Sequence, residues 1–166
     1  MKRSLAAITI AALLVLIPGT SAQARKPVRQ PVPDFNATVP AGVLCPFKIV
    51  VKTLVNREKQ LTYLDEQGNP VRATITGRLV ARIKNGDTGA SVVRNISGPV
   101  FLTFHADGSL TIKLTGISNI ALFPDDPGGP ALLITHGLTV LQINSDGDIT
   151  DFSTSGRVED LCQTLG

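Results

Sequence analysis

The amino-acid sequence predicts an all-β protein: an antiparallel meander of about eight strands that forms a closed or nearly closed barrel, with a short C-terminal helix. Apolar and polar residues alternate through most of residues 45–153, a pattern typical of half-buried strands. Clusters of Gly, Asn, Asp and Pro separate these stretches at short intervals. No helical segment lies between them, and parallel strands would need such crossover helices. A barrel is favoured because closure removes exposed edges; a β-sandwich is the alternative.

The first two predicted strands follow Cys45. Phe47, Ile49 and Val51 alternate with lysines, which indicates a strand with one buried face. A second short strand covers residues 60–64. The turn residues 68–70, Gly-Asn-Pro, end this strand region.

Residues 71–84 carry the clearest strand signal. Every odd position from Val71 to Ile83 is apolar or glycine, and the even positions are mostly Arg, Lys or Thr. This pattern predicts one long strand, or two collinear ones, with a single apolar face. A strand of that length must bend around a core, and Gly77 at its centre is the predicted bulge or kink.

The later strands are separated by turns. Residues 85–89 form a turn cluster, and the Pro- and Gly-rich residues 124–130 exclude regular structure. Hairpin turns are predicted at 106–108 and 146–147 because each contains Asp-Gly. The remaining predicted strands are residues 91–97, 99–105, 109–117, 120–123, 131–144 and 148–153.

The first 24 residues predict a cleaved secretory signal peptide. Lys2 and Arg3 precede an apolar run, and Ala-Gln-Ala at 22–24 supplies small residues for cleavage. The run of thirteen residues from Leu5 to Ile17 is short for a membrane-spanning helix, which needs about 20. A retained N-terminal anchor is the alternative. We therefore expect a secreted protein with no transmembrane segment after cleavage.

Cleavage changes the charge balance. The mature chain would hold 14 basic and 13 acidic residues, and from Phe35 onward 11 basic and 12 acidic. No clustered basic surface is evident, so nucleic-acid binding is not expected. Residues 25–44 contain four prolines and no periodicity, which predicts an extended arm ahead of a domain at 45–166. This basic arm is interpreted as a solvated spacer; a weak anchor to an anionic surface is the alternative.

The two cysteines, Cys45 and Cys162, bracket nearly the whole predicted domain. In an exported chain an isolated pair is most simply a disulfide. Ser155 can cap a short helix whose common face holds Val158, Leu161, Cys162 and Leu165. The disulfide would attach this helix to the start of the first strand.

Several segments together resemble a known group of proteins. These are NGDTGASVVRNISGP, HADGSLTIKLTG and LTVLQINSDGDITDFSTSGRVEDLC, with the two cysteines and the closing G-R-V-x-D-x-C as the most specific element. They resemble small secreted two-cysteine proteins of high-GC Gram-positive bacteria, a group without an assigned activity. That resemblance implies a barrel similar in shape to the allene oxide cyclase and dirigent type. It carries over no catalytic residue.

His136 is the candidate ligand-binding residue. By parity it falls on the apolar side of its strand with Leu132, Ile134, Leu138 and Val140, where an imidazole can line a barrel lumen and bind a ligand. Two other interpretations stay open. It can be a core histidine bonded to a backbone carbonyl, or it can be turned outward by a bulge at Gly137.

The other polar residues carry less chemistry. His105 is expected to be a solvated turn histidine. Asn144, Asp146, Asp148 and Asp151 invite a calcium site, but their order does not match an EF-hand loop, and turn geometry accounts for them. Asp125 and Asp126 are expected in a solvated loop. No nucleophile motif is present, and no cofactor, metal site or catalytic residue is predicted.

Three functions remain open from the sequence. The first is a non-catalytic module that binds a small apolar ligand. The second is a cyclase-type enzyme acting on an apolar substrate in the barrel lumen. The third is an extracellular interaction protein with a filled interior. A pocket of several hundred Å³ would favour the first two, and an enzyme would also need polar groups that converge inside it.

Overall fold

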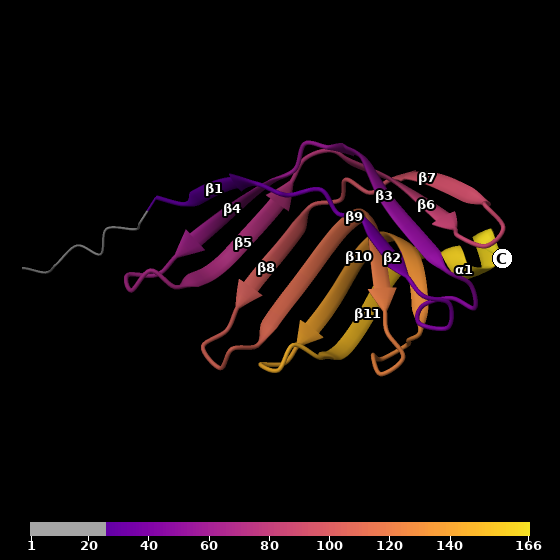
Figure 1. Cartoon of the computed structure of the whole chain (residues 1–166). Helices are drawn as coiled ribbons and strands as arrows, with labels where there is room; N and C mark the ends of the chain where they lie inside the picture. Colours follow the sequence, from indigo (N-terminus) through magenta and orange to yellow (C-terminus); the bar gives the residue numbers. More distant parts are fainter. Residues whose placement is uncertain (1–25) are drawn as a thin grey trace, which may run out of the picture.

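The computed structural model describes residues 26–166, which form eleven β-strands and one short helix (Figure 1). All strand pairs are antiparallel. One sheet has seven strands, in the order β1-β4-β5-β8-β9-β10-β11, and the other has four, in the order β2-β3-β6-β7. The elements are β1 (Val28–Pro31), β2 (Ala37–Val39), β3 (Ile49–Asn56), β4 (Lys59–Leu64), β5 (Pro70–Thr76), β6 (Leu79–Asn85), β7 (Ser91–Asn95), β8 (Val100–Phe104), β9 (Leu110–Leu122), β10 (Ala131–Ile143), β11 (Ile149–Asp160) and α1 (Leu161–Leu165).

The two orders correspond strand by strand, because the chain crosses from one sheet to the other four times. β1 and β2, β4 and β3, β5 and β6, and β8 and β7 are successive segments that occupy matching places in the two sheets. The protein is therefore a meander of seven long strands, the first four of which bend into two halves. Residues 71–84, predicted as one long strand or two collinear ones, are two strands in different sheets.

The bend between β5 and β6 lies at Gly77, where the sequence predicted it. Gly77 has φ +142°, a conformation that favours glycine. A Cβ at this position would lie 2.4 Å from the carbonyl oxygen of Arg57. The neighbouring long strand, formed by β3 and β4, bends beside Gly77. We call each such bent strand a ribbon. The Arg57 N–H of this ribbon donates to the Arg78 carbonyl at 2.8 Å. The two ribbons thus bend together.

The three longest strands bend at a row of glycines. Gly116 of β9 pairs with Gly137 of β10, which pairs with Gly156 of β11, and all three have positive φ. The bend at Gly137 is sharp enough that the Thr139 hydroxyl donates to that of Thr135, four residues earlier on the same strand, at 3.0 Å.

Two apolar clusters result from these bends. In the first cluster the two halves of β9 and of β10 pack on each other, together with the first half of β11. It includes Leu114, Ile120, Leu122 and Leu141. The opposite face of β10 packs against the four-stranded sheet and the helix. That second cluster contains Leu44, Cys45, Ile49, Ile83, Leu132, Ile134, Leu161 and Leu165.

The predicted disulfide between Cys45 and Cys162 is present, and it attaches α1 to the segment before β3. The helix is shorter than predicted, because residues 155–160 belong to β11. Asp160, rather than Ser155, is its N-cap, since the Asp160 carboxylate accepts from the backbone N–H of Cys162 at 2.8 Å.

The prediction of a closed barrel is wrong, and the two-sheet alternative fits the structure. β8 pairs with β9, whereas β7 pairs with β6 at the edge of the four-stranded sheet, so the meander divides between β7 and β9 and does not close. The described part of the predicted arm, from residue 26, adds one edge strand to each sheet as β1 and β2 and then turns at residues 41–43. Its prolines suit edges, where a missing N–H costs no ladder hydrogen bond. The predicted signal peptide lies outside the described residues, and no helix within residues 26–166 is long and apolar enough to cross a membrane.

Candidate functional site

A cavity of 320 Å³ lies between the four-stranded sheet and β9. We call it the inter-sheet cavity. Seven of its nine lining residues are apolar: Phe35, Val51, Leu79, Ala81, Ile83, Ile96 and Ala121; Thr53 and Asn119 complete the lining. It is therefore an apolar pocket with little polar surface.

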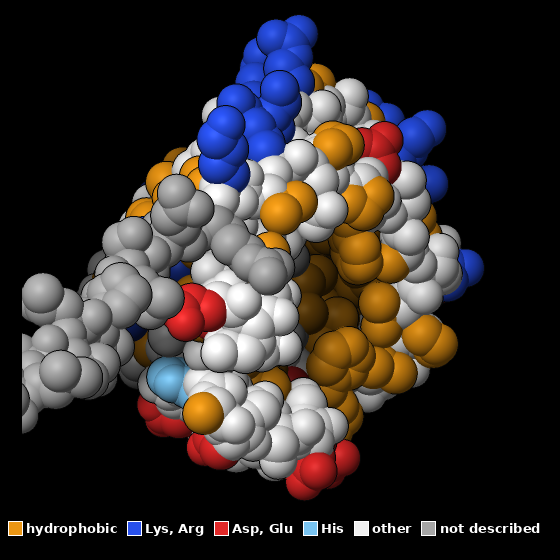
Figure 2. All heavy atoms as spheres, turned by 90° about the vertical axis from the view of Figure 1, so that its left-hand side faces the viewer, with side chains coloured by type: hydrophobic (Ala, Val, Ile, Leu, Met, Phe, Trp, Pro, Cys, Tyr) orange, Lys and Arg blue, Asp and Glu red, His pale blue; other side chains and the backbone are white. Residues whose placement is uncertain are grey.

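A second hollow of 160 Å³, the apex hollow, adjoins the first at the inner side of the bend. Leu79, Ile96 and Asn119 line both. The apex hollow adds Glu58 and Ser118 to Ile75, Gly98, Val100 and Leu114. Seen from the side of β4 and β5, the molecule has a deep hollow whose walls are mostly hydrophobic (Figure 2).

Phe35 is the one aromatic residue among the described residues that line the inter-sheet cavity. Its side chain is 64% exposed although it contributes to the cavity lining. The backbone at Phe35 is held on β3, since its N–H donates to Thr53 Oγ1 at 3.1 Å and its carbonyl accepts from the same hydroxyl at 2.7 Å. The ring thus stands at the cavity margin on an anchored backbone.

Glu58 is the one ionisable residue that lines either of these two hollows. It is 8% exposed, and its neighbours Arg57 and Lys59 are exposed. Desolvation by burial raises the pKa of the Glu58 carboxyl above its ordinary value. The two ion pairs among residues 26–166 do not include it.

Asn119 provides the second polar group. Its Oδ1 atom is buried and has no hydrogen-bond partner within the described part of the chain. Buried amide oxygens are rarely left unpaired. Glu58 and Asn119 therefore place acceptor groups without donors along one apolar space.

Neither residue was predicted from the sequence. Glu58 stands in the charged run Arg-Glu-Lys at 57–59, which resembles a solvated turn. Glu58 becomes buried because the chain bends at this point: the side chains of Arg57 and Lys59 point outward, and that of Glu58 points inward. Asn119 lies between the two segments predicted as 109–117 and 120–123, which are one strand, β9. The sequence signal that bears on this site is Gly77. It marks the bend between β5 and β6, but it does not show which other segment packs against that bend.

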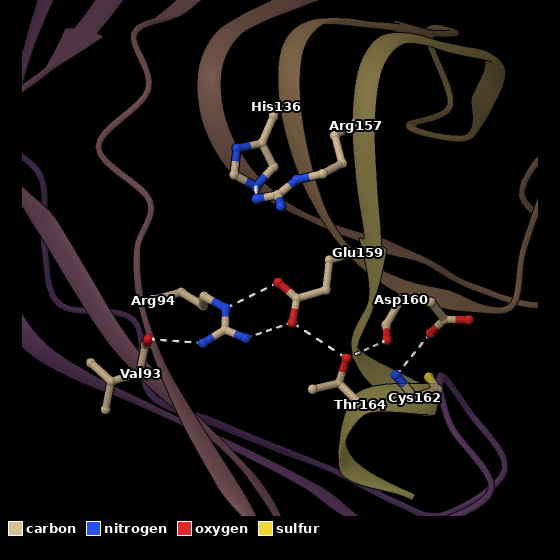
Figure 3. A network of polar contacts seen from close by, with 8 residues as sticks. All are labelled: Val93, Arg94, His136, Arg157, Glu159, Asp160, Cys162 and Thr164. Atoms are coloured by element: carbon tan, nitrogen blue, oxygen red, sulfur yellow. Dashed lines mark hydrogen bonds and ion pairs between the residues drawn. The ribbon is translucent and has the colours of Figure 1, made fainter.

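His136 lines a different hollow, a groove of 620 Å³ between β7 and the strands β9 to β11. We call it the His136 groove. The Nε2 atom of His136 lies 3.1 Å from Nη2 of Arg157 (Figure 3). Since guanidinium only donates, this contact makes Nε2 the acceptor. His136 is half-buried and lies on the side of β10 that faces β7. The hydrogen bond described for its ring is to the Arg157 side chain, whereas a core histidine was expected to bond to a backbone carbonyl.

An ion pair crosses the same groove. Arg94 of β7 and Glu159 of β11 form two hydrogen bonds, one of them 3.0 Å from Arg94 Nε to Glu159 Oε2 (Figure 3). Arg94 lowers the pKa of the Glu159 carboxyl, and Glu159 raises the pKa of Arg94. The pair links the free edge of the four-stranded sheet to the last strand of the other sheet.

The other candidates lie in turns. His105 is exposed, and its Nε2 lies 2.9 Å from the Thr111 hydroxyl. Asn144 Oδ1 accepts from the backbone N–H groups of Asp146 and Asp148, so these residues form a hairpin turn. No group of three or more metal-ligating side chains is found among residues 26–166.

The fold brings together basic side chains that are separated in the sequence. The strands of the four-stranded sheet contain no acidic residue. Lys52 and Arg82 are direct cross-strand partners. Residues 114–166, in contrast, contain seven acidic residues and one basic residue. Figure 2 shows Lys and Arg mainly at the top of the view and Asp and Glu mainly along the bottom.

Comparisons of this chain with protein-family models, with curated proteins and with solved structures find no match.

Proposed function

We propose that this protein is a non-catalytic binding protein that acts outside the cell and holds a small apolar ligand in the inter-sheet cavity. The observation that carries the proposal is the cavity itself, 320 Å³ lined by seven apolar residues, Thr53 and Asn119. Small-molecule sites are concave and mostly apolar, with few polar groups. A filled interior, as expected for a purely structural or interaction protein, would lack this space.

The size of the cavity limits the ligand. Its 320 Å³ would hold about ten non-hydrogen atoms if each takes roughly the 30 Å³ of a liquid water molecule. A ligand of that size is a short alkyl chain, a small terpene or a substituted benzene. Phe35 supplies an aromatic face at the margin, where it would cover the bound ligand.

Titration with n-butylbenzene, a neutral ten-carbon probe, tests the proposal by NMR. We expect saturable shifts of the Ala81 and Ala121 methyl groups, which line the cavity. Ala121→Leu would fill the cavity and weaken binding at least tenfold. Ala106→Leu, at an exposed turn position, is the matched control and should bind like the native protein. Shifts spread over the surface, or equal binding by both variants, would refute the proposal.

A cyclase-type enzyme is the second candidate, and Glu58 favours it. Desolvation raises the pKa of the Glu58 carboxyl, which makes this group a candidate general acid. Glu58 lines the apex hollow beside the apolar cavity. The resemblance to cyclase barrels adds no support here, because the two sheets do not close into a barrel.

Product analysis separates the two candidates. A ligand that co-purifies with the native protein is incubated with fresh native protein or with Glu58→Gln, extracted and analysed by chromatography. A binding protein returns the ligand unchanged in both cases. An enzyme returns a ligand with altered retention from the native protein alone.

A further inference from the structure

We propose that the occupant of the inter-sheet cavity is an apolar primary amine, whose ammonium group lies in the apex hollow against the Glu58 carboxylate and Asn119 Oδ1. This inference rests on the proposed binding function and specifies the head group of the ligand. Two acceptor groups without donors carry it, together with the apolar space that adjoins them.

The Glu58 carboxylate is the first of these acceptors. The residue is 92% removed from solvent, since 8% of its surface is exposed. Glutamate is almost never buried unless it is paired. The basic residues on either side of it, Arg57 and Lys59, are exposed, and neither ion pair among residues 26–166 involves Glu58. Glu58 is therefore a largely buried residue whose carboxylate has no ion-pair partner in the described chain.

The backbone holds Glu58 in this position. Its N–H donates to Asn56 Oδ1 at 2.9 Å, and the residue before it is bonded to Arg78 across the bend. Gly77 packs directly on the Glu58 backbone. The carboxylate is thus presented by a rigid corner, a good support for a binding group because little order has to be gained on binding.

Asn119 Oδ1 is the second acceptor. It is buried without a donor, and Asn119 lines both the apex hollow and the inter-sheet cavity. An unpaired buried acceptor destabilises the folded state, and a donor on the ligand would remove that penalty. The position of Asn119 at the junction of the two spaces places this acceptor where a head group would meet its tail.

These acceptors select among head groups. A carboxylate ligand has no donor and would be repelled by Glu58. A hydroxyl group has one donor and no charge. An ammonium group has three N–H donors and a positive charge, so it can pair with both oxygen-bearing groups and compensate the buried carboxylate. The apolar lining of the inter-sheet cavity then takes the alkyl part.

Calorimetric titration at pH 7 with decylamine, decan-1-ol and sodium decanoate, each below its aggregation concentration, tests the inference; n-butylbenzene reports on the cavity alone. We expect decylamine to bind at least tenfold more tightly than decan-1-ol, and decanoate to bind most weakly. Glu58→Gln should abolish the preference for the amine. Glu66→Gln, which changes an exposed acid in the β4–β5 turn, should leave it intact.

The outcomes are distinguishable. Binding of n-butylbenzene with equal affinity for the three head groups, or with decanoate tightest, overturns the inference and leaves the proposed function standing. Failure of all four compounds to bind overturns both. A preference for the amine that survives Glu58→Gln also overturns the inference. If Glu58→Gln does not fold, Glu58→Asp replaces it: we expect a weaker but measurable preference for the amine, and an unchanged preference would count against Glu58.

Discussion

Gly77 lies directly against Glu58: a Cβ atom at Gly77 would come within 2.5 Å of the Glu58 Cα. The residue that permits the bend of the β5–β6 ribbon is thus also the residue that lets the buried acid of the adjacent ribbon approach. The bend and the polar end of the candidate site are consequently one structural unit.

Gly77→Ala should destabilise the protein by about 3 kcal/mol, because it combines a backbone clash with an unfavourable positive φ. Gly42→Ala is the matched control. Gly42 has φ +84° but nothing within 4 Å of its Cβ position, so only the conformational cost of about 1–2 kcal/mol applies. Urea denaturation measures both. Equal losses of stability in the two variants would show that the close contact between Gly77 and Glu58 adds nothing to the cost of the substitution.

Glu58→Gln should make the protein more stable at pH 7 and remove a pH dependence. Because burial raises the pKa of Glu58 above 4.5, the folded state binds this proton more tightly than the unfolded chain. Stability therefore falls as the pH rises from about 4.5 through the raised pKa. Urea midpoints between pH 4 and pH 8 measure the effect, with Glu66→Gln as control. If Glu58→Gln kept the pH dependence of the native protein, Glu58 would not be its source.

The Arg94–Glu159 pair should contribute about 0.5–1 kcal/mol to stability, the range of partly exposed pairs, since its side chains are 31% and 24% exposed. A double-mutant cycle with Arg94→Met and Glu159→Gln measures the coupling. Because the pKa of Glu159 is lowered, this contribution is present above pH 4.5 and is lost as the pH falls through the lowered pKa. High salt should also reduce it. A coupling of zero at low salt would show that the pair does not link the sheets.

Removal of the disulfide should cost about 5 kcal/mol in the chain-entropy model, since Cys45 and Cys162 are 117 residues apart. The double variant Cys45→Ser/Cys162→Ser, compared with the oxidised native protein by urea denaturation, measures this loss. The reduced native protein should match the double variant. A loss below 1 kcal/mol would mean that the helix stays docked through its apolar contacts alone.

Local features of this chain could be predicted, and features that depend on distant segments could not. The alternation around Ile83 and Leu132, the bend at Gly77 and the cysteine pair each follow from residue spacing. The division of the meander between β7 and β9 does not, because strand pairing is not encoded by parity. The burial of Glu58 also escaped prediction, since it depends on a bend that brings two ribbons together.

The helix and the basic surface show the same limit. Ser155 and Asp160 are both acceptable N-caps in sequence terms, and only the pairing of residues 155–160 with β10 decides between them. The pairing of Lys52 with Arg82 likewise exists only after folding. The candidate site thus lies where the sequence is least informative, at junctions between elements.

The basic strands and the acidic C-terminal third place opposite charges on different parts of the molecule, although its net charge is small. Such a protein should be retained by both cation- and anion-exchange resins at neutral pH and low salt, each resin meeting a different face. It should also take a preferred orientation when it approaches any charged layer. Orientation, rather than net attraction, would then decide which end of the molecule a neighbouring surface meets first.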